Sequence, residues 1–110
     1  MTESAPLSMR VRNKLRKLGS TPGAIAKSLR TLGIKGLQES QTRCPLAMYL
    51  NKTLIESPGQ WWMVGGDIVQ RVEGNDVQPF TRTPAACRQF IDRFDAGKYA
   101  YLQTPGSLDT

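Results

Sequence analysis

The stretch RVRNKLRKLGSTPGAIAKSLRTLGIKG, which runs from Arg10 to Gly36, decides the fold of the first third of the chain. Its apolar residues recur every three or four positions, as they do on one side of an amphipathic helix. Gly19 and Gly33 each follow such a run, and glycine readily adopts the left-handed conformation that ends a helix. The stretch therefore predicts two helices joined by a short turn.

The second of these helices has the clearer boundary signals. Thr21 is placed to cap it, and Pro22 fits its first turn, where a main-chain N–H has no helical partner. We expect its core-facing residues to be Ile25, Leu29 and Leu32.

The same stretch carries the positive surplus of the chain. The net charge is +6, yet residues 1–35 hold eight Lys and Arg against one acidic residue, and residues 36–110 hold seven against eight. A surplus confined to one segment indicates an anionic partner, such as nucleic acid, an acidic protein or an anionic membrane surface. We expect the binding residues to be Arg10, Arg12, Lys14, Arg16, Lys17, Lys27, Arg30 and Lys35, with the first five pointing away from the core.

A third helix and a β-hairpin are predicted next. Pro45 fits a helical first turn, and Leu46, Leu50 and Leu54 form an apolar stripe behind it. The segment WWMVGGDIVQRV, residues 61–72, has the pattern of two strands around a Gly-Gly turn.

The hairpin leaves one question open. Side chains of neighbouring strand residues point to opposite faces, so either Trp61 or Trp62 faces the core and the other faces outward. A loop of two residues, or of three with Asp67, would decide which one, and the sequence fits both. We also weigh whether Tyr99 or Tyr101 packs over the outward Trp.

The rest of the chain is expected to form a loop and a last helix. Residues 73–82, EGNDVQPFTR, are expected to be a loop. Thr83 and Pro84 repeat the cap-and-proline start, and the core face that follows is Cys87, Phe90, Ile91 and Phe94. The sequence thus predicts an α+β fold with three N-terminal helices, a β-hairpin and a C-terminal helix around one core.

Length and composition fit one globular domain. We expect a single domain over residues 1–110, with flexible tails at 1–6 and 105–110. No apolar run approaches the roughly 20 residues that span a bilayer, so no membrane partner is expected. The first ten residues, MTESAPLSMR, lack the apolar centre of a secretory signal, which favours a cytoplasmic location.

The residue types present argue against an enzyme. Histidine is absent, which removes the commonest general base and metal ligand. Cys44 is the one plausible nucleophile, because Arg43 and a helix N-terminus would both lower its pKa, but no base is visible to activate it. Cys44 and Cys87 lie far apart without other ligand types nearby. We expect no catalysis, no cofactor and no metal, and a capping role for Cys44.

Three segments carry a resemblance. LRTLGIKG at 29–36, RCPLAMYL at 43–50 and FIDRFDAGKY at 90–99 resemble small uncharacterised proteins of actinobacteria and of the phages that infect them. The similarity spans about residues 22–100. Because that group has no established activity, the resemblance implies only a context, namely a phage or mobile-element accessory protein that acts on host components in the cytoplasm.

Two functions fit these observations. In the first, the N-terminal helices form a helix-turn-helix-like unit whose basic residues contact the phosphate backbone of nucleic acid, with little base reading. In the second, the protein binds and modulates an acidic host protein, or forms a homodimer, through an exposed Trp61 or Trp62. An exposed Trp could also stack on a base, so it does not separate the two.

Overall fold

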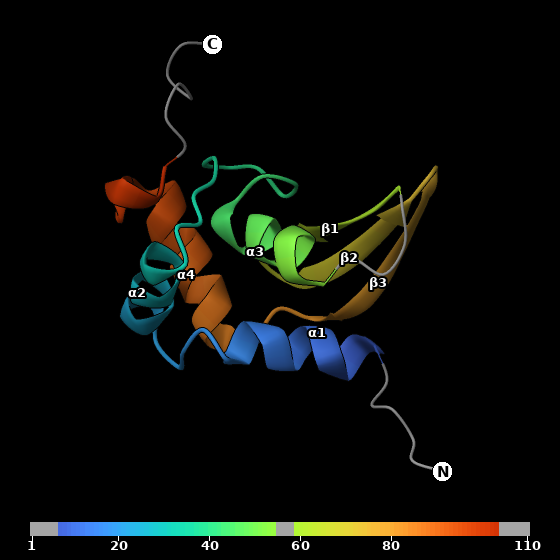
Figure 1. The fold of residues 1–110 in the computed structure, drawn as a ribbon, viewed down its shortest axis with the longest axis horizontal. Coiled ribbons are helices and arrows are strands. Elements are labelled where there is room, and N and C mark those ends of the chain that lie inside the picture. The colour runs from blue at the N-terminus through green and yellow to red at the C-terminus, as the bar shows by residue number, and fades with distance from the viewer. Residues whose placement is uncertain (1–6, 55–58, 104–110) are drawn as a thin grey trace.

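The computed structural model of this protein describes residues 7–54 and 59–103, and it shows an α+β fold (Figure 1). The predicted tails at 1–6 and 105–110 lie outside the described residues. Three helices come first, followed by an antiparallel sheet in the order β1-β2-β3, a fourth helix and a short 3-10 helix. The bounds are α1 Leu7–Arg16, α2 Pro22–Thr31, α3 Pro45–Thr53, β1 Gln60–Val64, β2 Ile68–Glu73, β3 Asp76–Arg82, α4 Ala85–Asp95 and η1 Ala100–Leu102.

One hydrophobic cluster joins these elements. The helices pack on different partners: α1 lies mainly against β3, α2 against α4 and η1, and α3 against β1. All four helices, the sheet and the 3-10 helix contribute large buried side chains, the largest of which are Trp62, Phe90 and Phe94. The first two helices therefore do not pack along each other.

The predicted starts of α2 and α3 are confirmed. The Thr21 hydroxyl accepts a hydrogen bond from the main-chain N–H of Ala24 at 3.1 Å, and the Cys44 sulfur accepts one from Ala47 at 3.4 Å. Pro22 and Pro45 occupy the first turns. Each cap satisfies an N–H that the helix itself leaves without an acceptor.

The end of α2 corrects one core assignment. Leu32, expected in the core, is 51% exposed, whereas Ile34 is buried. Gly33 adopts a left-handed φ of 73°, which turns the chain so that the Ile34 N–H donates to the Leu29 carbonyl at 2.9 Å. Ile34 thus covers the last turn of the helix, and Leu32 is left at the rim of the buried stripe.

The sheet register answers the question about the tryptophans. Val64 pairs with Val69 and Trp62 with Arg71, and the Gly65 N–H donates to the Ile68 carbonyl at 3.0 Å, so the chain reverses at Gly66 and Asp67. In this register Trp62 is fully buried and Trp61 is 45% exposed. The indole N–H of Trp62 donates to the Leu54 carbonyl at 2.8 Å.

The expectation of a loop at residues 73–82 is wrong, because most of this segment forms β3. Gly74 and Asn75 make a tight turn, with Gly74 at a φ of 63°, and Glu73 pairs with Asp76 on either side of it. Gly at the first of two turn residues is typical of a hairpin. Pro79 is tolerated because β3 is at the edge of the sheet, and the pairing slips by one residue between Val69 and Gln70.

The predicted Thr83 cap of α4 is also wrong. The Thr83 hydroxyl donates to the Gly65 carbonyl at 2.8 Å, and its N–H donates to the Asp67 carbonyl at 3.0 Å. These bonds tie the residue to the β1–β2 turn. Pro84 stands at the N-cap position and makes no side-chain hydrogen bond to the helix.

The polar connector at residues 35–43 is fastened to the C-terminal part of the described chain. The Gly36 N–H donates to the Leu102 carbonyl at 2.8 Å, the Gln38 amide donates to the Phe94 carbonyl at 3.0 Å, and the Glu39 N–H donates to an Asp95 carboxylate oxygen at 2.8 Å. These bonds fix the connector and the helix that follows it.

Candidate functional site

The four basic residues of α1 and Lys17, which directly follows it, form two separate flanks. Successive helix residues are turned by about 100°, so residues on either side of the buried stripe of Val11, Leu15 and Leu18 point in different directions. One flank, here called the Tyr49 flank, consists of Arg10, Lys14 and Lys17. The other, here called the pocket flank, consists of Arg12 and Arg16. The two flanks lie on opposite sides of the buried stripe.

The Tyr49 flank is turned toward α3. The Lys14 ammonium lies 6.0 Å from the centre of the Tyr49 ring, and the Tyr49 hydroxyl donates to the Lys14 carbonyl at 3.1 Å. Arg10 and Lys17 are exposed, and Lys14 is partly exposed. Burial raises the pKa of Tyr49, so the hydroxyl stays protonated and continues to donate this bond over the physiological range.

The pocket flank is turned toward the end of β3 and the start of α4. Arg12 and Arg16 line a pocket of about 460 Å³ together with Arg82. Arg82 was not among the predicted residues, because nothing in the sequence pairs α1 with β3. The sequence does show the i, i+4 spacing that places Arg12 and Arg16 side by side.

The predicted residues after α1 are dispersed over other surfaces. Lys27 is exposed on α2 and turned away from the core. The Arg30 guanidinium lies 5.1 Å from the centre of the Tyr101 ring, a contact that holds it near η1. Lys35 is exposed beside a hollow that Met48 and Lys52 also line. These three do not converge with the α1 residues on one small site.

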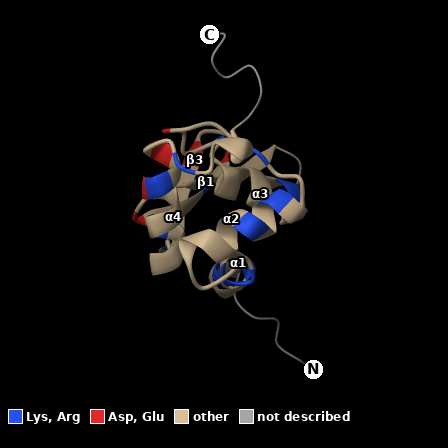
Figure 2. Ribbon diagram, turned by 90° about the vertical axis from the view of Figure 1, so that its left-hand side faces the viewer, with Lys and Arg blue, Asp and Glu red and all other residues tan. Residues whose placement is uncertain are grey.

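The surface around α1 is nevertheless basic without acidic neighbours in the same helix. Figure 2 shows Lys and Arg around α1, viewed end-on, and the acidic residues on parts of the chain away from it. No acidic side chain occurs in α1 or α2. Arg12, Lys14, Arg16 and Lys17 form no ion pair with another residue of the described chain. Their charge is therefore available to an anionic partner.

Trp61 belongs to a small apolar row on the outer face of the sheet. Trp61 pairs with Val72, and Val72 pairs with Val77, so the three side chains lie in line across the strands. Val72 is buried, whereas Trp61 and Val77 are about half exposed. Tyr99 and Tyr101 do not cover this row, because Tyr99 stacks on Phe90 and Tyr101 lies near Arg30.

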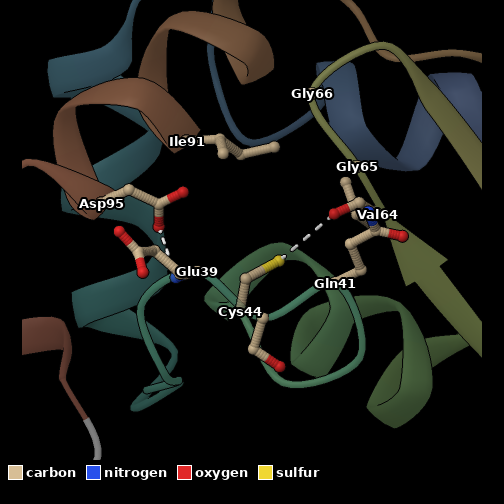
Figure 3. Close-up of a pocket in the computed structure, with 9 residues that line it drawn as sticks. Glu39, Gln41, Cys44, Val64, Gly65, Gly66, Ile91 and Asp95 are labelled. Atoms are coloured by element: carbon tan, nitrogen blue, oxygen red, sulfur yellow. Dashed lines mark hydrogen bonds between the residues drawn. The ribbon is translucent and has the colours of Figure 1, made fainter.

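A second pocket, of about 200 Å³, contains the thiol of Cys44 (Figure 3). Val64 and Gly65 line it from the sheet side, and Glu39 and Asp95 bring carboxylates from the connector and from α4. The Cys44 thiol is directed at the Val64 carbonyl oxygen, 3.8 Å away, and is engaged in the capping bond from Ala47.

Neither thiol is activated. Burial raises the pKa of Cys44 to about 11 and outweighs the main-chain N–H groups of Ala47 and Leu46, which lower it; the nearby Asp95 raises it further. Burial, followed by the interaction with Cys44, raises the pKa of Cys87 to about 12. The helix N-terminus thus lowers the Cys44 pKa as expected, but Arg43 is not among the groups that shift it, and desolvation of the thiolate is the larger effect.

Two further findings concern metals and membranes. Within residues 7–54 and 59–103, no three Cys, Asp or Glu side chains come together as a metal site requires. In the same part of the chain, no helix has the length and apolar character to span a bilayer.

Comparison with known proteins supplies no relative. The three segments that carry the resemblance place a helix end at Gly33, a helix start at Cys44 and a helix end at Gly97, and they supply core residues as well. The chain matches no protein-family description, no curated protein and no solved structure.

Proposed function

We propose that this protein is a non-enzymatic binder of nucleic acid that contacts the phosphate backbone through α1. The observation that carries this proposal is the concentration of four Lys and Arg within one ten-residue helix that has no acidic residue, with Lys17 directly after it. Ammonium and guanidinium groups on such a surface neutralise phosphates and release their counterions, so the binding depends steeply on salt and little on sequence.

The packing of the helices supports backbone contact over base reading. A recognition helix must project its outer face into a groove, whereas α2 is packed against α4 and η1 and offers few basic residues outward. Lys27 and Arg30 would then contribute contacts with phosphate only. The resemblance to phage and actinobacterial proteins adds the proposed context, an accessory factor in the cytoplasm.

The test compares two charge-reversed triple variants by fluorescence anisotropy with a labelled DNA duplex and an RNA duplex. One variant reverses the Tyr49 flank, with Arg10, Lys14 and Lys17 changed to Glu. The matched control reverses three exposed residues of the later chain, Arg43, Arg93 and Lys98. Both change the net charge equally, so loss of binding in the first variant alone would assign the contact to α1.

The wild type should bind with an affinity that falls steeply between low and moderate salt. Each lost phosphate contact should reduce the slope of log K against log salt by about one unit. Equal weakening in both triple variants would show a diffuse charge effect. No binding of either duplex at low salt would contradict the proposal.

A second candidate function is binding of an acidic host protein, and the row of Trp61, Val72 and Val77 favours it. A half-exposed Trp and a half-exposed Val on either side of a buried Val form the kind of surface that lies at the centre of an interface, and the basic helices would complement an acidic partner. Capture from host lysate that survives nuclease treatment and is lost in Trp61→Ala would favour this function. Light scattering of the purified protein tests the homodimer.

A further inference from the structure

The pocket lined by Arg12, Arg16 and Arg82 lies between two parts of the chain that are distant in sequence. Its walls are the C-terminal part of α1, the α1–α2 turn at Gly19 and Ser20, the end of β3 and the first turn of α4. Figure 1 shows the chain passing from β3 into α4 directly beside α1. A volume of about 460 Å³ is within the range of pockets that bind small ligands.

Three arginines give this pocket its chemistry. Arg12 and Arg16 come from neighbouring turns of α1, and Arg82 comes from the last position of β3. No acidic residue lines the pocket, and the three guanidiniums form no ion pair with another described residue. Like charges brought together without counter-ions repel each other, so an anion placed among them would be held by all three.

The start of α4 adds main-chain donors to the same pocket. The hydrogen bonds of α4 begin at Arg88, whose main-chain N–H donates to the Pro84 carbonyl at 3.0 Å. Pro84 has no side-chain group to cap the helix, and Thr83 is engaged with the β1–β2 turn. The N–H groups of Ala85, Ala86 and Cys87 are thus left for other acceptors, and these residues line the pocket.

We propose that this pocket binds a phosphomonoester, either at the 5′ end of a nucleic-acid strand or on a small ligand. The part that concerns a strand end rests on the proposed function. Three guanidiniums and a free helix N-terminus match a group with two negative charges and three acceptor oxygens. A phosphodiester within a strand carries one charge and has a sugar on each side, so it suits the open Tyr49 flank better than this recess.

The first experiment titrates the isotope-labelled full chain with sodium phosphate at pH 7.5 and follows the main-chain amide signals by NMR. Sodium chloride at matched ionic strength is the reference. The Ala85, Ala86 and Cys87 signals should shift and saturate with phosphate only. Arg82→Gln should weaken the binding at least about tenfold, which is the loss of roughly one charged hydrogen bond. Arg93→Gln, an exposed arginine in the last turn of the same helix, should leave it unchanged.

The same spectra show whether each variant is folded, because signals far from the pocket should stay in place. Arg16→Gln provides a second variant from a different element. Binding should also weaken as the pH falls through about 6, where a phosphomonoester takes up its second proton. An absence of saturable shifts at α4, or equal shifts in Arg82→Gln and the wild type, would overturn the proposal.

A second experiment identifies the source of the phosphate. Two single strands of one sequence, with and without a 5′-phosphate, are compared by anisotropy. A preference for the phosphorylated strand that disappears in Arg82→Gln assigns the pocket to strand ends. Equal binding of both strands, together with saturable inorganic phosphate, assigns it to a small phosphorylated ligand. The proposed function is tested separately, by the loss of duplex binding when the charges of the Tyr49 flank are reversed. Either proposal can therefore fail while the other stands.

Discussion

Trp61 and Trp62 are adjacent in the sequence, yet their surroundings differ completely. Trp62 is fully buried, meets the Phe80 ring edge-on at 5.2 Å and donates its indole N–H to Leu54, whereas Trp61 is about half exposed. Trp62→Ala should therefore lower the free energy of unfolding by roughly 3–5 kcal/mol. Trp61→Ala should change it by less than about 1 kcal/mol. Urea unfolding of both variants measures the difference, and equal losses would contradict this arrangement.

The buried thiols should be unreactive in the native protein. Because burial raises the pKa of Cys44 to about 11 and that of Cys87 to about 12, almost no thiolate is present at neutral pH. Labelling with a thiol reagent should be slow in buffer and rapid in denaturant. Cys44→Ser should keep the fold and lower the free energy of unfolding by about 1–2 kcal/mol. Rapid, complete labelling of the folded protein would contradict the structural role.

The same pKa shifts imply a loss of stability in alkali. In the unfolded chain the Cys44 thiol ionises near its ordinary pKa of 9.0, below its folded value of about 11. The contribution to stability is therefore complete below about pH 9 and is lost as the pH rises through the folded pKa. Urea unfolding at about pH 8 and about pH 10 should show a smaller decline in Cys44→Ala than in the wild type. Tyr49, whose pKa is also raised, contributes to the decline in both proteins.

Among the elements, β1 is an edge strand of the sheet. The main-chain groups on its open edge are hydrogen-bonded by the Asn51 side chain and by the connector at Gln41. The Asn51 side chain accepts from the Trp62 N–H at 2.6 Å and donates to the Trp62 carbonyl at 3.2 Å, and the Val64 N–H donates to the Gln41 carbonyl at 2.8 Å. Open strand edges pair with other chains, so this closure protects the monomer from association.

Removing the Asn51 amide should expose that edge. Asn51→Ala leaves the Trp62 N–H and carbonyl without partners, which should lower the free energy of unfolding by about 1–3 kcal/mol. Light scattering at rising concentration should also show more association than in the wild type. Asn13→Ala, at an exposed position on α1, is the matched control and should show neither effect. A fully stable, monomeric Asn51→Ala protein would contradict the role assigned to Asn51.

The starts of α2 and α3 are predictable because they depend on neighbouring residues, whereas the cap of α4 and the strand β3 are harder to predict. Thr21, Pro22, Cys44 and Pro45 act within a few residues of themselves, which is the range that a sequence pattern reports. The strand β3 is exposed along most of its length and contains a proline, so it lacks the alternation that marks a strand. The Gly-Asn turn before it was the signal that could have found it.

In the predicted site, too, features set by neighbouring residues can be predicted from the sequence, whereas features set by distant packing cannot. Helical spacing alone separates the Tyr49 flank from the pocket flank, since it places Arg12 and Arg16 on one side and Lys14 on the other. The approach of Arg82 depends on the packing of β3 on α1, and no local pattern encodes it.

At the scale of the whole molecule, the stability of the fold depends on a close contact between two main-chain segments at Gly36. A side chain at the buried Gly36 would overlap the Arg43 carbonyl oxygen and the Pro45 nitrogen, both main-chain atoms that cannot move aside. Gly36→Ala should therefore unfold the protein or lower its melting temperature severely. Gly23→Ala, on α2 with open space around it, should instead stabilise by about 0.5–1 kcal/mol. Thermal melts by circular dichroism measure both, and a stable Gly36→Ala would contradict this packing.

The hydrogen bond from Gly36 to the Leu102 carbonyl also sets an order of events during synthesis. A ribosome makes α2 and the connector long before it makes α4 and η1, the elements against which they pack. The nascent chain consequently holds the apolar side of α2 uncovered until residues 94–103 have left the exit tunnel. Contacts between segments so far apart in the sequence slow folding, because the loop must close before they form. The interval before that closure is the time at which this protein is most exposed to chaperones and proteases.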